Sequence, residues 1–263
     1  MADTSELDAS VPGEDSPKAQ IPKSVLVVDI GGTKLKMLAS GQTEPRKTAS
    51  GTRMTPAKMV EAVKDLADGW EYEAISLGFP GLVGEHGPRS EPGNLGAGWV
   101  GFDYAAAFGL PVRICNDAAM QALGSYEGGR MLFLGFGTGL GSALIVHNTI
   151  ITLELGRILY ADGTELSAIL GRHGLRTLGK KVWRESVSKT VPALMGAFAA
   201  DYVVLGGGNS KEIKALPPGT RLGHNLTAFR GGFRLWHLED LPTLDIAGEL
   251  PNSTAAANEW RMF

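Results

Sequence analysis

The chain predicts an α/β protein built from two halves, each of which opens on a glycine-containing hairpin. Short apolar runs typical of strands alternate with stretches of helical periodicity. The 36 glycines in 263 residues fall in clusters between the predicted strands. The order strand, glycine turn, strand occurs near residue 30 and again near residue 137.

The first half contains four predicted strands and two helices. The strands are expected at residues 25–30, 34–39, 74–79 and 112–115. One helix is expected to follow Thr55, because Pro56 suits a first helical position and Met59, Val60, Val63 and Leu66 form an apolar stripe. The second helix is expected from about Asp117 to Tyr126.

The second half repeats this plan. Strands are expected at residues 131–136, 140–146 and 202–205, with Gly137-Thr138-Gly139 as the turn between the first two. Helices are expected at about 164–171 and 179–200, and a further one near Asn209.

The two ends of the chain differ from this core. Residues 1–23 are rich in Ser, Asp, Glu, Ala and Pro without apolar periodicity, so we expect a disordered leader. Residues 241–263 are expected to form a tail that can dock through Trp260 and Phe263. Between these ends we expect an N-terminal domain, 24–125, and a C-terminal domain, 126–240.

Composition argues against several classes of protein. A net charge of −3 gives no broad attraction for nucleic acid. No apolar run approaches the roughly 20 residues that cross a bilayer, and the N-terminus lacks an apolar signal core, so a cytoplasmic location without membrane contact is expected. Cys115 is the only cysteine, which excludes an internal disulfide, and its strand-like setting predicts a packed thiol.

Asp29-Ile30-Gly31-Gly32-Thr33 is the first candidate binding segment. Glycines let a backbone turn tightly and present N–H groups to phosphate oxygens. The aspartate at the end of the strand is suited to hold Mg²⁺ through water. A plain hairpin turn explains the same residues equally well.

Gly135-Phe136-Gly137-Thr138-Gly139-Leu140-Gly141-Ser142 is the second candidate. Its four glycines in seven positions exceed what a two-residue turn requires, and Thr138 adds a hydroxyl suited to a terminal phosphoryl oxygen. A strand is expected to follow, which separates the segment from the dinucleotide-binding fingerprint, and the Lys-Ser/Thr of a P-loop is missing. A glycine-rich hairpin without a ligand is the alternative.

Asn116-Asp117 is the third candidate, at the change from strand to helix. Both residue types are favoured as helix caps, which is the simpler interpretation. The functional interpretation is that Asp117 accepts the proton of an attacking hydroxyl while Asn116 orients the substrate, because phosphoryl transfer depends on positioned groups.

Taken in order, these segments resemble the ROK family (repressor, open reading frame, kinase), and most closely its polyphosphate-glucokinase branch. The resemblance covers about residues 24–236. The segments that carry it are Asp29-Ile30-Gly31-Gly32-Thr33, Gly78-Phe79-Pro80-Gly81, Asn94 with Trp99-Val100-Gly101, Asn116-Asp117-Ala118, Gly137-Thr138-Gly139-Leu140-Gly141, Glu154-Leu155-Gly156 and Gly206-Gly207-Gly208.

The resemblance implies two actin-like (ribonuclease H-like) domains with an inter-domain cleft, and Asp117 as the catalytic base. Its implied phosphate- and nucleotide-binding residues are Asp29, Gly31, Gly32, Thr33, Lys34, Gly137, Thr138, Gly139, Gly206, Gly207 and Gly208. Its implied sugar-binding residues are Gly81, Asn94, Asn116, Asp117, Glu154, Arg157 and Glu165, of which Glu165 is the looser match. Mg²⁺ is the implied cofactor and a homodimer the implied assembly.

Arg157 departs from the family pattern, in which a sugar-contacting His follows Glu-x-Gly. Imidazole donates and accepts hydrogen bonds, whereas guanidinium only donates and stays charged. We therefore expect altered specificity or weakened turnover more than lost chemistry. Guanidinium directed to solvent is the other possibility.

Several motifs of other ROK subgroups are missing from this sequence, which indicates the subgroup that it resembles. The cysteine-rich zinc segment of many ROK members is missing, as in the polyphosphate branch, and the leader is too short and polar for the DNA-binding helices of the repressors. The five histidines are scattered without ligand spacing, so no zinc site is expected. Trp99 is expected to pack beneath the sugar-side loop, and Lys180, Lys181 and Arg184 are expected on a solvated helix face that can also meet a long polyphosphate donor.

Two functions from different classes remain. The first is a sugar kinase that moves a phosphoryl group from ATP or inorganic polyphosphate to the 6-hydroxyl of a hexose, with glucose as the first guess. The second is a non-catalytic sugar- or nucleotide-binding protein derived from such a kinase, with its acceptor site altered at Arg157. The sequence leaves the donor open.

Overall fold

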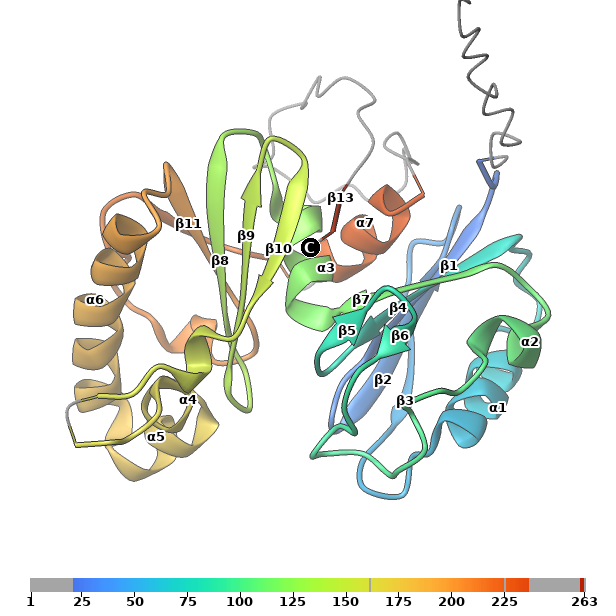
Figure 1. Ribbon diagram of the computed structural model, residues 1–263, viewed down its shortest axis with the longest axis horizontal. Coiled ribbons are helices and arrows are strands. Elements are labelled where there is room, and N and C mark those ends of the chain that lie inside the picture. The colour runs from blue at the N-terminus through green and yellow to red at the C-terminus, as the bar shows by residue number, and fades with distance from the viewer. Residues whose placement is uncertain (1–20, 161, 225, 237–260, 263) are drawn as a thin grey trace, which may run out of the picture.

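The computed structural model describes residues 21–160, 162–224, 226–236 and 261–262. Most of the expected leader and tail, including Trp260 and Phe263, lies outside the described residues. The described chain forms two mixed sheets, each with helices packed against it (Figure 1).

The first sheet has five strands in the order β3-β2-β1-β4-β7. The strands are β1 (Val25–Ile30), β2 (Lys34–Ala39), β3 (Arg46–Ala49), β4 (Ala74–Phe79) and β7 (Val112–Asn116). β1 pairs antiparallel with β2 and parallel with β4, and β4 pairs parallel with β7. Every residue of β4 is buried, as expected for a strand covered on both faces. One face packs against α1 (Pro56–Leu66) and α2 (Tyr104–Phe108).

The second sheet has six strands in the order β12-β11-β8-β9-β10-β13. The strands are β8 (Arg130–Phe136), β9 (Leu140–Val146), β10 (Thr149–Leu153), β11 (Tyr202–Gly206), β12 (Thr220–Leu222) and β13 (Arg261–Met262). Its outer face packs against α4 (Leu166–Leu170) and α6 (Gly179–Ala197), with α5 (Arg172–Thr177) between these helices in the chain. The short pair β5 (Val83–Gly84) and β6 (Gly87–Pro88) forms a separate ribbon.

Two helices join the sheets. α3 (Asp117–Ser125) follows β7 and packs against β8, β9 and β10, whereas α7 (Thr227–Arg234) packs against α3, β1 and β4 (Figure 1). The two backbones meet directly, because a Cβ on Gly124 would lie 1.8 Å from the carbonyl oxygen of Thr227, and one on Gly231 equally close to that of Met120. Arg234 donates to the carbonyl oxygens of Leu123 and Tyr126 at the end of α3.

Most of the predicted elements are confirmed. Both glycine hairpins, the strands at 74–79, 112–115 and 202–205, and the helices after Thr55 and from Asp117 are present. Thr55 caps α1 through a hydrogen bond from the Lys58 N–H, and Pro56 is its first residue. Cys115 and Trp99 are buried as predicted.

Three predictions were wrong or incomplete. The helix expected near Asn209 is only a 3₁₀ turn, η2 (Ser210–Glu212), because Pro217 and Pro218 soon follow and no apolar stripe supports a longer helix. The helix expected at 164–171 ends at Leu170, and Arg172 starts α5. The pattern also missed α7, whose two glycines, Gly231 and Gly232, lower its helix propensity but allow close packing.

In the described residues, no helix is both long and apolar enough to cross a membrane. The division into domains at 24–125 and 126–240 stays a prediction. α7 comes from the second of these ranges and packs on the sheet of the first.

Candidate active site

Asp117 lies where β7 gives way to α3, and Asn116 caps that helix. The Asn116 side-chain oxygen accepts from the N–H groups of Ala118 and Ala119 at 2.9 and 3.1 Å. Its amide nitrogen donates to the carbonyl oxygen of Gly81 at 3.0 Å. The cap therefore also fixes the Pro80-Gly81 backbone beside Asp117, and one N–H of Asn116 remains for a ligand.

Asp117 is a partly buried carboxyl whose pKa is raised to about 7. Burial is the largest cause, and the negative charges of Asp29 and Glu154 add to it, while the Ala118 N–H opposes the shift. Asp29 ends β1 in the first sheet, whereas Glu154 follows β10 in the second. Two predicted site carboxyls from distant parts of the sequence thus lie within electrostatic reach of Asp117.

The first glycine turn, Gly31-Gly32-Thr33, follows Asp29 directly. Asp29 forms an ion pair with Lys36 of β2 at 3.3 Å, and its side chain is 13% exposed. Ser50 donates its hydroxyl to the Gly31 carbonyl oxygen at 2.5 Å. A Cβ on Gly32 would lie 2.8 Å from the Cβ of Asn94, so the predicted sugar-binding Asn94 rests against this turn.

The second glycine turn, Gly137-Thr138-Gly139, is held by residues from three other segments. The Arg172 N–H donates to the carbonyl oxygens of Gly137 and Thr138 at 3.0 and 3.2 Å. Asn209 donates its side-chain amide to Gly137 at 2.9 Å. The hydroxyl of Ser167 accepts from the Leu140 N–H at 3.1 Å.

Both turns leave backbone donors for a ligand. Within the described residues, the N–H groups of Gly32, Thr33, Thr138 and Gly139 donate to no group of the chain. Both hairpins direct their turns toward the same end of the molecule (Figure 1). The second hairpin also touches the start of α3, because a Cβ on Gly141 would lie 2.9 Å from that of Ala118. These donors suit the oxygens of an anion.

Gly206-Gly207-Gly208 ends β11 beside the second turn. Gly207 has φ +78° and lies so close to Phe136 that an added Cβ would be 2.6 Å from its carbonyl oxygen. A side chain at this position is therefore excluded on two grounds. The Asn209 N–H donates to the same Phe136 carbonyl at 2.9 Å.

The remaining predicted sugar-binding residues lie between β10 and α4. Glu154 precedes the 3₁₀ turn η1 (Leu155–Arg157) and Arg157 is its last residue, and both side chains are exposed. Glu165 is exposed and immediately precedes α4. The acceptor segment, defined here as residues 154–157, is tied to β9 through the hydroxyl of Ser142, which accepts from the Leu155 N–H at 3.1 Å.

Glu91 fixes the loop that carries Trp99 and was missed at the sequence level. Its carboxylate accepts from the N–H groups of Gly98, Trp99 and Val100 at 3.0, 3.1 and 3.2 Å. These bonds, led by that from Trp99, hold its pKa below the usual range. Lys36, Ser167 and Asn209 were missed as well. Only Lys36 had a signal in the sequence, because a hairpin that turns at Gly31-Gly32-Thr33 places Lys36 directly opposite Asp29 on the second strand.

The cations at the start of α6 are more engaged than predicted. Lys180 pairs with Glu212 at 2.8 Å, and Arg184 donates to the Glu212 carbonyl oxygen at 2.6 Å. These contacts connect α6 with η2, next to the Gly206-Gly207-Gly208 segment.

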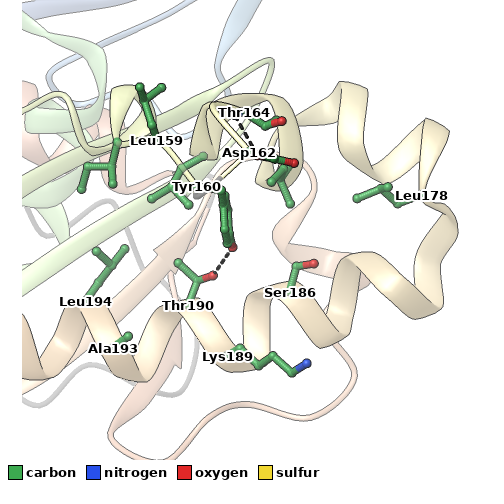
Figure 2. A pocket seen from close by; sticks show the side chains of 13 residues that line it. Leu159, Tyr160, Asp162, Thr164, Leu178, Ser186, Lys189, Thr190, Ala193 and Leu194 are labelled. Atoms are coloured by element: carbon green, nitrogen blue, oxygen red, sulfur yellow. Dashed lines mark hydrogen bonds between the residues drawn. The ribbon is translucent and has the colours of Figure 1, made fainter.

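A cavity of about 690 Å³ lies apart from these residues, between α6 and the segment that follows Arg157 (Figure 2). Its walls are mainly apolar, with Leu159, Tyr160 and Leu194 among them, and Tyr160 shares a hydrogen bond with Thr190 at 2.9 Å. Neither Asp117 nor Glu154 lines it. In the described residues, no group of three or more His, Cys, Asp or Glu is arranged to hold a metal ion directly.

The chain is similar to several known proteins. The model of the ROK family matches residues 25–157, about half of the chain. A polyphosphate glucokinase of Mycobacterium tuberculosis is 26% identical over 222 residues, which cover 75% of this chain and 82% of that protein.

Solved structures agree with the predicted fold. An inorganic polyphosphate/ATP-glucomannokinase of an Arthrobacter strain superposes with a TM-score of 0.71 at 22% identity, covering 84% of this chain and 100% of that one. A ROK family glucokinase of Streptomyces griseus, solved with glucose and AMPPNP, gives a TM-score of 0.60 at 19% identity over 81% and 98% of the two chains. The predicted actin-like α/β fold is confirmed, and this chain belongs to the ROK family.

Proposed function

We propose that this chain is a sugar kinase that transfers a phosphoryl group from ATP or inorganic polyphosphate to the 6-hydroxyl of a hexose, with glucose as the first candidate. The observation that carries the proposal is the partly buried Asp117, whose pKa of about 7 suits a general base near neutral pH. The functions of two relatives, a polyphosphate glucokinase and a polyphosphate/ATP-glucomannokinase, support the same class of reaction.

The base acts on the sugar hydroxyl. Above pH 7 the Asp117 carboxylate is ionised and accepts the hydroxyl proton as the oxygen attacks the terminal phosphorus of the donor. The partial burial of Asp117 strengthens its electrostatic contacts with neighbouring groups. Asn116 and the Pro80-Gly81 backbone, which it fixes, orient the acceptor.

The two turns supply donors for the phosphoryl group. The N–H groups of Gly32, Thr33, Thr138 and Gly139 make no hydrogen bond within the described chain, so they are available to phosphate oxygens. Fixed backbone dipoles of this kind stabilise charge that develops during transfer. The ammonium of Lys36, 41% exposed beside Asp29, adds a positive charge to the first turn.

The residues at the first turn also fit Mg²⁺. Asp29 is a partly exposed carboxylate within electrostatic reach of Asp117, and hard oxygen ligands with retained water are what Mg²⁺ prefers. Asp29 would hold the ion through water, and the ion would screen the negative charge of the donor. Lys36 would then exchange its ion pair for contact with the donor.

The alternative is a non-catalytic binder, favoured by the exposed Arg157 next to Glu154. A matrix of donors (ATP, polyphosphate) against acceptors (glucose, mannose, N-acetylmannosamine, glucosamine) separates the two functions. Turnover with any pair supports the kinase, and Asp117→Ala should reduce kcat by about 10²–10⁴-fold. Ligand binding by calorimetry without hexose phosphate from any pair would establish the binder.

A further inference from the structure

Ser167 lies where the donor side and the sugar side of the site meet. It is the second residue of α4, directly after Glu165 and Leu166. Its hydroxyl accepts from the Leu140 N–H, the first group after the second glycine turn, at 3.1 Å. The same hydroxyl lies against Gly156 of the acceptor segment.

The space around this hydroxyl is closed on both sides. A Cβ on Gly139 would lie 3.0 Å from the Ser167 oxygen, and one on Gly156 only 2.2 Å from it. A Cβ on Gly156 would also lie 2.9 Å from the Leu140 carbonyl oxygen. Any larger residue at Gly156 would displace Ser167 or the end of the donor turn, so the three backbones are packed around one oxygen atom.

Helix α4 extends this connection at both ends. At its start, the Leu166 N–H donates to the carbonyl oxygen of Ile158, just beyond the acceptor segment, at 2.9 Å. At its end, the Gly171 N–H donates to the Ser167 carbonyl oxygen. The N–H of the next residue, Arg172, donates to the carbonyl oxygens of Gly137 and Thr138. A displacement of the acceptor segment is therefore transmitted to the donor turn through both the Ser167 hydroxyl and the helix.

We propose that Ser167 is a positioning residue that couples sugar binding at Glu154 and Glu165 to the geometry of the donor turn Gly137–Gly139. The inference rests on the proposed function. A sugar that fixes the acceptor segment also fixes Gly156, and through Ser167 the donor turn, so the donor binds more tightly when the sugar is present. By thermodynamic linkage the donor tightens sugar binding by the same factor.

Ser142 offers a matched comparison. Its hydroxyl donates to the Leu153 carbonyl at 2.8 Å and accepts from the Leu155 N–H at 3.1 Å. It is thus a serine of the same sheet region that ties backbone to the acceptor segment without a contact to the donor turn. Ser188 on α6, whose hydroxyl donates to the Glu185 carbonyl, serves as a distant control.

The experiment measures donor affinity by calorimetry with and without saturating 6-deoxyglucose, which lacks the accepting hydroxyl and so prevents turnover. Mg²⁺ with ATP and Mg²⁺ with tripolyphosphate are the two donor probes. We expect 6-deoxyglucose to tighten binding of at least one donor about tenfold in the unchanged protein and less than about twofold in Ser167→Ala. Ser142→Ala and Ser188→Ala should retain the factor of about ten.

Folding is checked by thermal melting, and alanine is a good helix former at this position. Ser167→Cys is a second variant, because a thiol of similar size is a weak acceptor, and it should lose the factor in the same way. Three results would each overturn the inference. They are a tenfold tightening of donor binding by 6-deoxyglucose in Ser167→Ala, a loss of this tightening in Ser142→Ala equal to that in Ser167→Ala, and no tightening in the unchanged protein. Absence of any hexose phosphorylation would instead remove the proposed function itself.

Discussion

The two glycine turns have similar sequences but are held in different ways. Within the described residues, hydrogen bonds from outside the first hairpin reach its turn from Ser50 alone, through its hydroxyl to Gly31 and its N–H to Thr33. The second turn receives bonds from Arg172 and Asn209, and the next residue, Leu140, is bonded to Ser167. The first turn is therefore the more adjustable of the two, and the second is a fixed frame.

The difference suits two tasks. A frame fixed by several independent bonds keeps donor N–H groups oriented before the ligand arrives, which lowers the reorganisation needed for transfer. A turn with fewer external bonds can move when a ligand with its metal ion binds beside Asp29 and Lys36. Each of the following substitutions tests one half of this comparison.

The largest effect is expected from Gly207→Ala, which breaks the support of the second turn. The residue has φ +78°, and the new Cβ would lie 2.6 Å from the Phe136 carbonyl oxygen, so we expect a loss of about 2–4 kcal/mol in the free energy of unfolding. Urea denaturation measures it. Gly208→Ala is the matched control, since nothing lies within 4 Å of its Cβ position. Equal losses in the two variants would show that the turn does not depend on this close contact.

The second effect concerns Asp117, whose pKa of about 7 depends more on Asp29 of the first half than on Glu154 of the second. Asp29→Asn should therefore lower the Asp117 pKa more than Glu154→Gln does. An NMR titration of the Asp117 carboxyl carbon, without metal or ligand, measures both, with Asp117→Asn to assign the signal. A larger change from Glu154→Gln would reverse the assigned roles of the two halves.

The same shift predicts a stability effect of definite sign. The folded pKa lies above the ordinary value, so the native state binds this proton more tightly than the unfolded chain does, and stability falls as pH rises from about 4 to 7. Asp117→Asn should unfold at higher temperature than the unchanged protein at pH 8, while losing turnover. Each pKa unit of displacement corresponds to about 1.4 kcal/mol. A lower melting temperature for the variant at pH 8 would contradict this.

The smallest effects are expected from the side chains that bond the turn carbonyls. Ser50→Ala removes the hydroxyl that donates a hydrogen bond to the Gly31 carbonyl oxygen. Because one hydrogen bond contributes about 1 kcal/mol, we expect the KM for the phosphoryl donor to rise about fivefold. Asn209→Ala should raise the same KM only about twofold, because the Arg172 N–H still donates to the Gly137 carbonyl oxygen. Initial rates at saturating sugar measure both. The reverse order would mean that the second turn is not redundantly held.

Local patterns were enough to predict the main strands and the position of Asp117 between a strand and a helix. Val25 to Ile30 and Ala74 to Phe79 are mainly apolar runs, interrupted only by Asp29, Ser76 and Gly78, and buried parallel strands have this composition. The change from strand to helix at Asn116-Asp117 was also predicted locally, but the pattern alone fits a helix cap, and the role of Asp117 as base was implied by the resemblance to the ROK family. Such features depend on residues that are neighbours in the sequence.

Long-range contacts could not be predicted in this way. Ser167 and Asn209 meet the second turn only after the chain has folded, and nothing beside them in the sequence indicates a turn partner. Glu91 caps a loop seven to nine residues away with no periodic pattern. Helix α7 was missed because Gly231 and Gly232 depress local helix propensity and are explained only by α3 and Val27, against which they pack.

The position of α7 has a consequence for how the protein is made. Its Phe229 and Phe233 cover the face of the first sheet that carries Val25 and Val27, yet the ribosome adds this helix near the end of the described core. At about 5–20 residues per second, β1 leaves the ribosome roughly 10–40 s before its cover. The nascent chain therefore carries an open apolar sheet face for most of its synthesis, which is the kind of surface that chaperones bind.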